Sequence, residues 1–366
     1  MDNILILSLN DKLGGAEQVL KMIALYHDKN IKIKVFFFSS QRTDSWNDLS
    51  LKLNIDFTYS NFKNPYLGVF SFINLLLNKN YYERVYSSNV FVNSLTGVLR
   101  KINLLNAKLL IGRESTNPFN RFGSFKKSIY RFIYTFGYRE LDLLIFQTIQ
   151  MKNDFKKKMP NLYSKINSRI IHNPISLTAQ KNDFRNSFFD KNFIVTAGRL
   201  IPEKGYDNLI HAFKNFRVNQ PDINLIILGD GPEKDNLHKL IINLELTGSV
   251  FLKGFVKNVY PYFEKAKICI VSSRIEGFPN VLLQMMSQNT KVISTLCAGG
   301  IKDLKGVFTV EVDDIKELSS MMTNVLKQDT HKNRVIFDIL LRKRDINVFM
   351  KDISDSIKKN EQKNNY

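Results

Sequence analysis

The chain has 366 residues, of which 44% are hydrophobic and 24% are charged. These fractions are near the globular average and exclude a collagen-like, fibrous or wholly disordered protein. Its two cysteines, Cys269 and Cys297, are too few for a disulfide scaffold or for a zinc site of four thiolates. The 53 lysines and arginines exceed the 34 aspartates and glutamates by 19, an excess that bears on partners and not on fold.

Short apolar runs alternate with helical patterns in the first half of the chain. A helix is expected over residues 16–27, and buried strands at residues 4–7, 33–38, 108–111 and 143–146. Continuous apolar runs separated by helices predict a parallel sheet that is covered on both faces. No apolar run reaches the roughly 20 residues of a membrane helix, and no leader pattern opens the sequence. We therefore expect a cytoplasmic protein.

The same pattern begins again in the second half. Helical patterns separate further expected strands at residues 193–197, 225–228, 250–252, 268–271 and 292–293. Two such series predict an α/β protein with two doubly wound, Rossmann-like domains, in which ligands bind at the carboxyl ends of the strands. We place the domains at residues 1–173 and 174–345, followed by a C-terminal helix and tail at 346–366. The cleft between the domains is the expected site.

Two segments place glycines and cations directly after expected strands. The segment LGGAE at residues 13–17 opens the first helix, where glycines permit a close backbone approach and free N–H groups favour phosphate. The segment GRLIPEKG at residues 198–205 carries Arg199 and Lys204, which can hold phosphate oxygens and stabilise a departing diphosphate. A tight turn and a solvated basic loop are the structural alternatives.

The most informative segment is RIEGFPNVLLQMM, at residues 274–286. Glu276 lies in its loop beside the backbone amides of Gly277 and Phe278, and a carboxylate with free amides suits the hydroxyl groups of a sugar. Gln284 lies about one turn inside the following helix, on the face that points back to the loop. A capping role for the stretch is the alternative.

In this order, five motifs resemble glycosyltransferase family 4. They are GGAE, GRLIPEKG, ILGDGPE, LKGFV and EGFPNVLLQMM, which begin at residues 14, 198, 227, 252 and 276. The resemblance covers the whole second domain and, more loosely, the first. It implies a retaining enzyme of the GT-B fold, of the type that builds bacterial surface polysaccharides. In that fold two Rossmann-like domains face each other across a cleft.

The resemblance also implies roles for individual residues. Arg199 and Lys204 match the pair that holds the donor diphosphate, and Glu276 matches a carboxylate that contacts donor-sugar hydroxyls, so these three are the expected catalytic residues. The other expected donor-binding residues are Gly14, Gly15, Gly198, Gly229, Gly254, Phe255, Gly277, Phe278, Pro279, Asn280 and Gln284. Where Gln284 stands, the family has a second glutamate that grips the ribose. An amide keeps one acceptor and two donors for that contact.

Arg113 and Glu114 follow the expected strand at residues 108–111. The matching loop of the family often carries a histidine, and here an Arg-Glu pair stands instead. As a hypothesis, one of the two positions the acceptor or the donor sugar. A structural ion pair is the alternative.

The segment SFKKSIYRFIYTFGYR, at residues 124–139, predicts a helix with two contrasting faces. Phenylalanines and isoleucines occupy one face. The other face carries Lys126, Lys127, Tyr130, Arg131 and Tyr134, and such a mixture of cations and tyrosines suits an anionic membrane surface. An ordinary solvated face is the alternative.

Taken together, the residues and the resemblance imply a retaining hexosyltransferase. It would move a hexose or N-acetylhexosamine from a nucleotide diphosphate sugar, UDP-linked rather than GDP-linked, to a lipid-linked oligosaccharide of an O-antigen, capsule or lipopolysaccharide. Such an acceptor would place it on the inner face of the plasma membrane. No metal or other cofactor is expected. A nucleotide-sugar-binding protein of the same fold with weakened catalysis is the alternative. A nucleic-acid-binding protein is suggested by charge alone, and no recognisable nucleic-acid-binding motif supports it.

Overall fold

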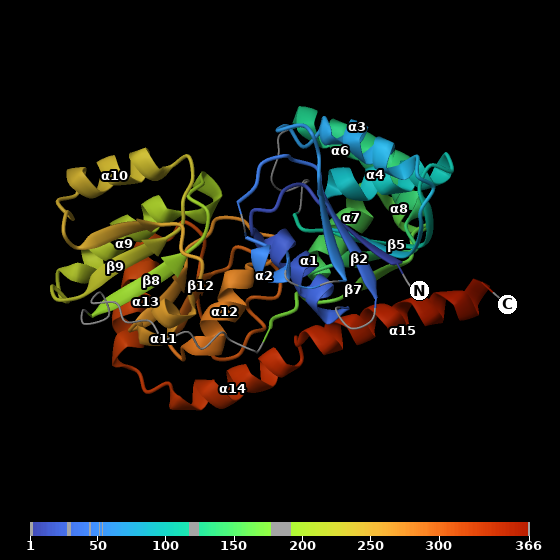
Figure 1. The fold of residues 1–366 in the computed structure, drawn as a ribbon. Coiled ribbons are helices and arrows are strands. Elements are labelled where there is room, and N and C mark those ends of the chain that lie inside the picture. The colour runs from blue at the N-terminus through green and yellow to red at the C-terminus, as the bar shows by residue number, and fades with distance from the viewer. Residues whose placement is uncertain are drawn as a thin grey trace. The chain divides into compact units, whose positions relative to one another are not determined.

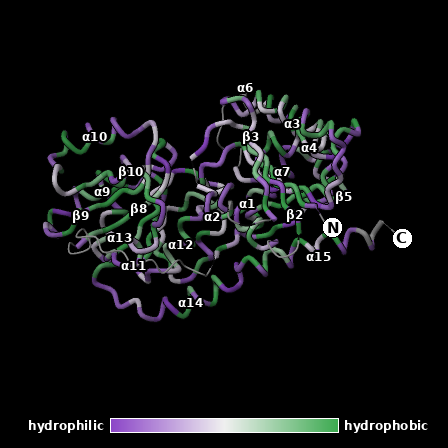
Figure 2. Tube along the Cα trace, in the orientation of Figure 1, coloured by the Kyte–Doolittle hydropathy of each residue, from purple (hydrophilic) through white to green (hydrophobic). Residues whose placement is uncertain are grey.

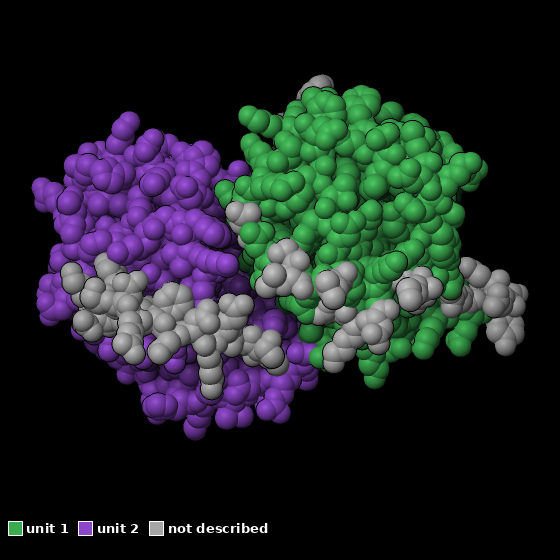
Figure 3. Space-filling model, in the orientation of Figure 1, with its two compact units in different colours: residues 1–174, 346–366 green, residues 175–345 purple. Residues whose placement is uncertain are grey.

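The computed structural model describes residues 3–27, 31–43, 45–50, 52, 54–116, 124–176 and 192–364 (Figure 1). The chain divides into two compact units, which are coloured separately in Figure 3. The first unit comprises residues 1–174 and 346–366, and the second comprises residues 175–345. Each unit is built on a parallel sheet of its own, as the two series of apolar runs predict.

In the described part of the first unit, seven parallel strands form a sheet in the order β3-β2-β1-β4-β5-β6-β7. The strands are β1 (Asn3–Ser8), β2 (Lys32–Phe37), β3 (Ile55–Tyr59), β4 (Tyr81–Ser87), β5 (Asn106–Arg113), β6 (Leu143–Phe146) and β7 (Ser168–Ile170). The four strands expected in this half are confirmed as β1, β2, β5 and β6. Strands β3, β4 and β7 lack a continuous apolar run, and the hydrophobic pattern therefore does not reveal them.

Helices cover both faces of this sheet. They are α1 (Gly15–Tyr26), α2 (Asn47–Ser50), α3 (Gly68–Leu76), α4 (Val90–Lys101), α6 (Ser124–Gly137), α7 (Ile149–Lys158), α8 (Pro160–Tyr163) and α15 (Ile346–Asn364). Along β1, Leu5 and Leu7 join one hydrophobic cluster while Ile4 and Ile6 join another, because successive side chains of a strand point to opposite faces. Helix α15 packs against α1 and adds Phe349 to the cluster of Ile4.

The second unit has the same layered construction. Its described residues form a six-stranded parallel sheet in the order β10-β9-β8-β11-β12-β13. The strands are β8 (Phe193–Ala197), β9 (Asn224–Leu228), β10 (Val250–Gly254), β11 (Ile268–Val271), β12 (Val292–Thr295) and β13 (Phe308–Val310). The helices are α9 (Tyr206–Arg217), α10 (Lys234–Asn243), α11 (Tyr260–Lys265), α12 (Asn280–Gln288), α13 (Ile315–Lys327) and α14 (His331–Arg342). Figure 2 shows the hydrophobic residues concentrated along the strands of both units.

The helix expected within residues 124–139 forms as α6, but it buries other side chains than expected. Tyr134 is 1% exposed and belongs to the hydrophobic cluster that contains Leu5. Tyr130 is partly buried against that cluster. In contrast, Ile129, Phe132 and Phe136 are 45%, 65% and 52% exposed. The expectation that Tyr130 and Tyr134 line an exposed basic face is therefore wrong.

Close packing of α6 on α4 explains this orientation. A Cβ atom at Gly97 of α4 would lie only 1.8 Å from the carbonyl oxygen of Gly137. The Ser94 hydroxyl donates to the carbonyl oxygen of Ile133 over 2.6 Å. Small residues on α4 thus let the two backbones approach, and the approach turns the side of α6 that bears Tyr134 inward.

The cations of the expected surface divide into two groups. Arg131 is exposed, whereas the side chains of Lys126 and Lys127 lie outside the described residues. None of the described helices combines the length and the hydropathy that are needed to cross a bilayer.

Candidate functional site

Glycines bring the loops after β8, β9 and β10 together at the carboxyl edge of the second sheet. The Gly229 amide donates to the carbonyl oxygen of Gly254 over 2.7 Å. A Cβ atom at Gly229 would lie 1.8 Å from the carbonyl oxygen of Gly198, and one at Gly231 would lie 2.3 Å from that of Leu200. Only glycine fits such contacts, and Gly229 also has a φ of +141°. These glycines therefore shape the loops of the candidate site.

Lys204 and Glu276 form an ion pair at this edge. Lys204 ends the 3-10 turn η3 (Pro202–Lys204), and Glu276 lies in the loop between β11 and α12. The Ser273 hydroxyl donates to Oε1 of Glu276 over 2.9 Å. The Lys204 and Glu276 side chains are 19% and 17% exposed, so both keep access to solvent. The sequence pattern does not identify Ser273 as a site residue. Its position two residues after β11, at the carboxyl edge of the sheet, is the feature that could have indicated it.

Arg199 lies in the same loop as Lys204 and has an exposed side chain. Its neighbour Gly198 borders the Lys204 side chain, since a Cβ atom there would lie 3.4 Å from Cε of Lys204. The same Cβ atom would lie 2.7 Å from the hydroxyl of Tyr206. Within the described residues, Arg199 makes no ion pair. The structure thus brings two of the three expected catalytic residues into contact and leaves the third as a solvated cation on the same loop.

The loop from Gly277 to Asn280 offers backbone and not aromatic groups. Phe278 is 6% exposed and packs in the hydrophobic core, and the guanidinium of Arg344 lies 4.8 Å from its ring centroid. Pro279 is the N-cap of α12, and no side chain caps the helix there. The amino end of α12 therefore presents backbone N–H groups beside the Glu276 loop, an arrangement that favours an anion.

The remaining expected donor-binding residues of this unit lie at the end of β10 and on α12. Phe255 follows β10 and is 57% exposed, and Gly254 before it has a φ of +74° with open space where a side chain would project. Gln284 is on α12, and its side chain hydrogen-bonds the hydroxyl of Tyr260. Burial raises the pKa of Tyr260, although the hydrogen bond from Gln284 opposes the shift.

In the first unit, Gly14 and Gly15 are exposed at the start of α1, directly after the β1 loop. The Glu17 carboxylate folds back over this turn, because a Cβ atom at Gly14 would lie 2.6 Å from its Oε2. Their position after the first strand agrees with the expectation.

Arg113 and Glu114 are buried at the carboxyl end of β5, 4% and 1% exposed, with no direct ion pair between them among the described contacts. Arg113 donates to the Ser88 hydroxyl over 2.8 Å and to Oδ1 of Asn173. Burial lowers its pKa to about 10. This side chain is thus enclosed by residues that follow β4 and β7, partners that spacing along the sequence does not indicate.

Glu114 instead accepts hydrogen bonds from the hydroxyls of Tyr134, over 3.0 Å, and of Tyr138. Burial raises the pKa of Glu114 to about 7, although these hydrogen bonds oppose the shift. Because both carboxylate oxygens are occupied inside the protein, any effect of Glu114 on a ligand passes through its neighbours.

Comparison with known proteins shows that the second unit, which carries Lys204 and Glu276, is similar to glycosyltransferases. Residues 179–337 match the model of the family "Glycosyl transferases group 1". An uncharacterised glycosyltransferase of Methanocaldococcus jannaschii is 32% identical over 50% of this chain and 48% of its own length. An N-acetylgalactosamine-N,N'-diacetylbacillosaminyl-diphospho-undecaprenol 4-alpha-N-acetylgalactosaminyltransferase of Campylobacter jejuni is 30% identical over 61% of this chain and 62% of its own length. The chain thus spans about half to three-fifths of these relatives.

Among solved structures, HepE of Anabaena in complex with UDP-glucose superposes with a TM-score of 0.79. The superposition covers 98% of this chain and 100% of the HepE chain, and the two sequences are 20% identical. This likeness confirms the expected GT-B fold. Within this fold, the segment at residues 179–337 is similar to the domain of the glycosyltransferase group 1 family.

Proposed function

We propose that this protein is a retaining glycosyltransferase that moves a hexose or N-acetylhexosamine from a UDP-sugar to a lipid-linked oligosaccharide of a bacterial surface polysaccharide. The contact of Lys204 with Glu276 at the sheet edge of the family domain is the observation that carries the proposal. The UDP-glucose bound to HepE supports the choice of donor. The diphospho-undecaprenol in the name of the Campylobacter relative supports the choice of acceptor.

In the proposed reaction the bond between the sugar C1 and the diphosphate oxygen breaks, and the acceptor hydroxyl attacks C1 from the same face. Negative charge then grows on the departing UDP. Lys204 and Arg199 stabilise that charge, while the N–H groups at the start of α12 add partial positive charge. Glu276, oriented by Ser273, accepts hydrogen bonds from the donor-sugar hydroxyls. The acceptor proton leaves with the diphosphate, so no protein base is required, and no protein nucleophile is required because the acceptor attacks C1 directly.

A screen of nucleotide sugars tests this function. Thermal unfolding measured with each UDP- and GDP-sugar should show stabilisation by the true donor of about 2.7 kcal/mol at 100 times its Kd. Incubation of that radiolabelled donor with lipid-linked oligosaccharide should then yield a glycosylated lipid. Stabilisation without product favours a nucleotide-sugar-binding protein with weakened catalysis, the candidate raised by Gln284. Failure of every nucleotide sugar to stabilise the protein rejects both functions.

Gln284→Glu should retain or increase affinity for the donor nucleotide. The carboxylate offers the ribose the charged acceptor that the family uses, and the Tyr260 hydroxyl, which accepts from the Gln284 amide, is able to rotate and donate to a carboxylate instead. Calorimetric titration with UDP measures the effect. A large loss of affinity in this variant would contradict a ribose-binding role for position 284.

The exposed side of α6 supports a peripheral position on an anionic membrane. Ile129, Phe132 and Phe136 lie on one side of the helix, and the ring centroids of Phe132 and Phe136 are 4.3 Å apart. Residues 121–173 carry 11 basic and 3 acidic side chains. Apolar side chains that enter the headgroup region, with cations around them, are the features of interfacial helices. We therefore assign the membrane contact to the exposed side of α6 that carries Ile129, Phe132 and Phe136, and no longer to the face that carries Tyr130 and Tyr134.

Replacing both Phe132 and Phe136 by serine should reduce binding to anionic vesicles at least about tenfold, since one buried phenylalanine contributes roughly 1.5–3 kcal/mol. Vesicle flotation at low salt measures the bound fraction. Val218→Ser is the matched control, because Val218 is 78% exposed on the second unit. Equal flotation of the double variant and the wild type would reject this surface.

A further inference from the structure

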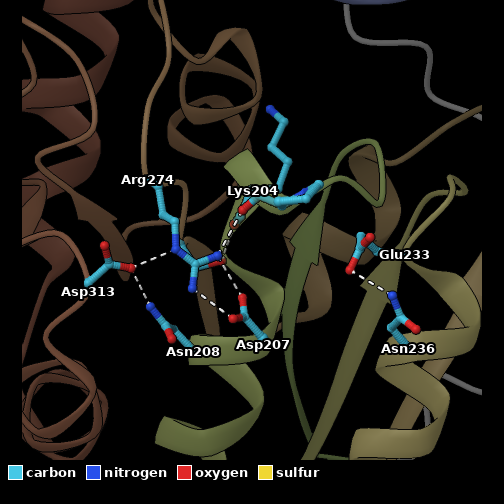
Figure 4. Close-up of polar contacts among 9 residues, drawn as sticks. Lys204, Asp207, Asn208, Glu233, Asn236, Arg274 and Asp313 are labelled. Carbon is cyan, nitrogen blue, oxygen red and sulfur yellow. Dashed lines mark hydrogen bonds and ion pairs between the residues drawn. The ribbon is translucent and has the colours of Figure 1, made fainter. Parts of the chain in front are cut away.

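Arg274 joins its own loop to the stretch from Pro202 to Asp207 and to Asp313 (Figure 4). Its guanidinium donates to both carboxylate oxygens of Asp207, over 2.8 and 2.7 Å. It also donates to Oδ1 of Asp313 over 2.7 Å and to the carbonyl oxygen of Pro202 over 2.8 Å. One side chain thus makes four hydrogen bonds to three residues in two separate segments.

Two of the segments joined in this way carry the candidate catalytic groups, namely the stretch from Pro202 to Asp207 and the loop of Arg274 itself. Pro202 begins the turn that ends at Lys204, and Asp207 lies in the first turn of α9, just after it. Arg274 itself stands two residues before Glu276, and its backbone amide donates to the carbonyl oxygen of Glu203 over 2.7 Å. The guanidinium therefore fastens the loop of the carboxylate to the turn of the lysine.

Two further contacts close the arrangement. Asn208 donates to the same Oδ1 of Asp313 over 2.6 Å, so Asp313 joins α9 to Arg274. The Ser272 hydroxyl donates to the carbonyl oxygen of Lys204 over 2.9 Å. In Figure 4 the Lys204 side chain extends away from Arg274.

Lysine cannot reproduce this arrangement. A guanidinium is planar and offers five N–H donors in a fixed fork, whereas an ammonium is a single point charge. The pKa of Asp207 lies below its ordinary value because hydrogen bonds and charge from Arg274 outweigh the effect of burial. The Arg274 pKa is raised, mainly by the hydrogen bonds to Asp207. The pair is therefore charged at neutral pH.

We propose that Arg274 is a positioning residue that holds Lys204 and Glu276 at the separation in which one donor molecule reaches both. Lys204 contacts the diphosphate and Glu276 contacts the sugar, so an error in their spacing affects the complete donor more than it affects UDP. The inference rests on the proposed function, and it adds a residue that touches neither substrate.

Arg274→Lys tests the inference, with Arg334→Lys as the matched control. Arg334 is similarly half-buried in the same unit, and it bonds a carboxylate, Asp338, and a backbone carbonyl. We expect Arg274→Lys to lower kcat at least tenfold, to weaken UDP-glucose binding at least fivefold, and to change UDP affinity less than threefold. Asp207→Asn should have the same effects, and the double variant should be no worse than Arg274→Lys. Arg334→Lys should match the wild type.

The outcomes separate this inference from the proposed function. An active wild type whose kcat is unchanged by Arg274→Lys overturns the positioning role alone. Parallel losses of UDP affinity, UDP-glucose affinity and melting temperature also overturn it, because they show a merely structural residue. If the wild type forms no product, the ratio of UDP-glucose to UDP affinity still decides the role. A wild type that binds neither probe overturns both the inference and the function.

Discussion

Lys204→Ala should lower sugar transfer by about 100- to 1,000-fold, the loss typical of removing one donor to a developing oxyanion. The lysine is held at the sheet edge by its ion pair with Glu276, where the departing diphosphate gathers charge in the proposed reaction. Steady-state kcat with a labelled UDP-sugar measures the loss. Lys214→Ala is the control, because Lys214 is an exposed lysine of α9 in the same unit.

Stability distinguishes this role from a structural one. A partly exposed ion pair contributes roughly 0–1 kcal/mol, so the melting temperature of Lys204→Ala should fall by no more than about 4 °C. A variant with wild-type kcat would remove Lys204 from the chemistry. A large fall in melting temperature with a proportionate loss of activity would make the lysine a structural residue only.

Gly229→Ala should destabilise the second unit by at least about 3 kcal/mol, a loss reserved for severe steric and backbone conflicts. The added Cβ atom would lie 1.8 Å from the carbonyl oxygen of Gly198, a backbone atom that no side-chain rotation can move. The φ of +141° adds strain for any other residue. At 2–4 °C per kcal/mol, the melting temperature should fall by about 6–12 °C.

Gly248→Ala is the matched control for this prediction. Gly248 also has a positive φ, +83°, but nothing lies within 4 Å of the position of its Cβ atom. Its replacement should cost only the backbone strain, about 1–2 kcal/mol. Equal losses in the two variants, measured by thermal unfolding, would show that the close approach of the loops at Gly229 and Gly198 is not tight in solution.

The candidate site could be predicted in part because its residues are close in sequence to strand ends. Lys204 and Glu276 both follow a buried strand, and the carboxyl ends of parallel strands meet at one edge of a sheet. Their contact is thus a consequence of topology that motif spacing anticipates. The partners of Arg274 could not be predicted, since Asp207 and Asp313 lie 67 and 39 residues from it and nothing local marks the three as neighbours.

The α6 helix shows where pattern alone failed. Tyrosine is amphipathic, so Tyr134 suits a membrane surface or a buried hydrogen bond equally well by composition. The decision came from Gly97 and Ser94 on α4, which allow a close approach, and from the buried Glu114 carboxylate, which needs donors. As a result, Phe132 stands exposed.

By itself, the sequence determined the two parallel sheets and the glycines and charged residues of their loops, because continuous apolar runs and backbone close approaches leave local marks in the chain. Only the tertiary structure decided which side of α6 faces the core, which residues enclose Arg113, and which carboxylates Arg274 joins. Those outcomes depend on side chains brought together from distant segments, where packing space and the need to satisfy buried polar groups outweigh local preference.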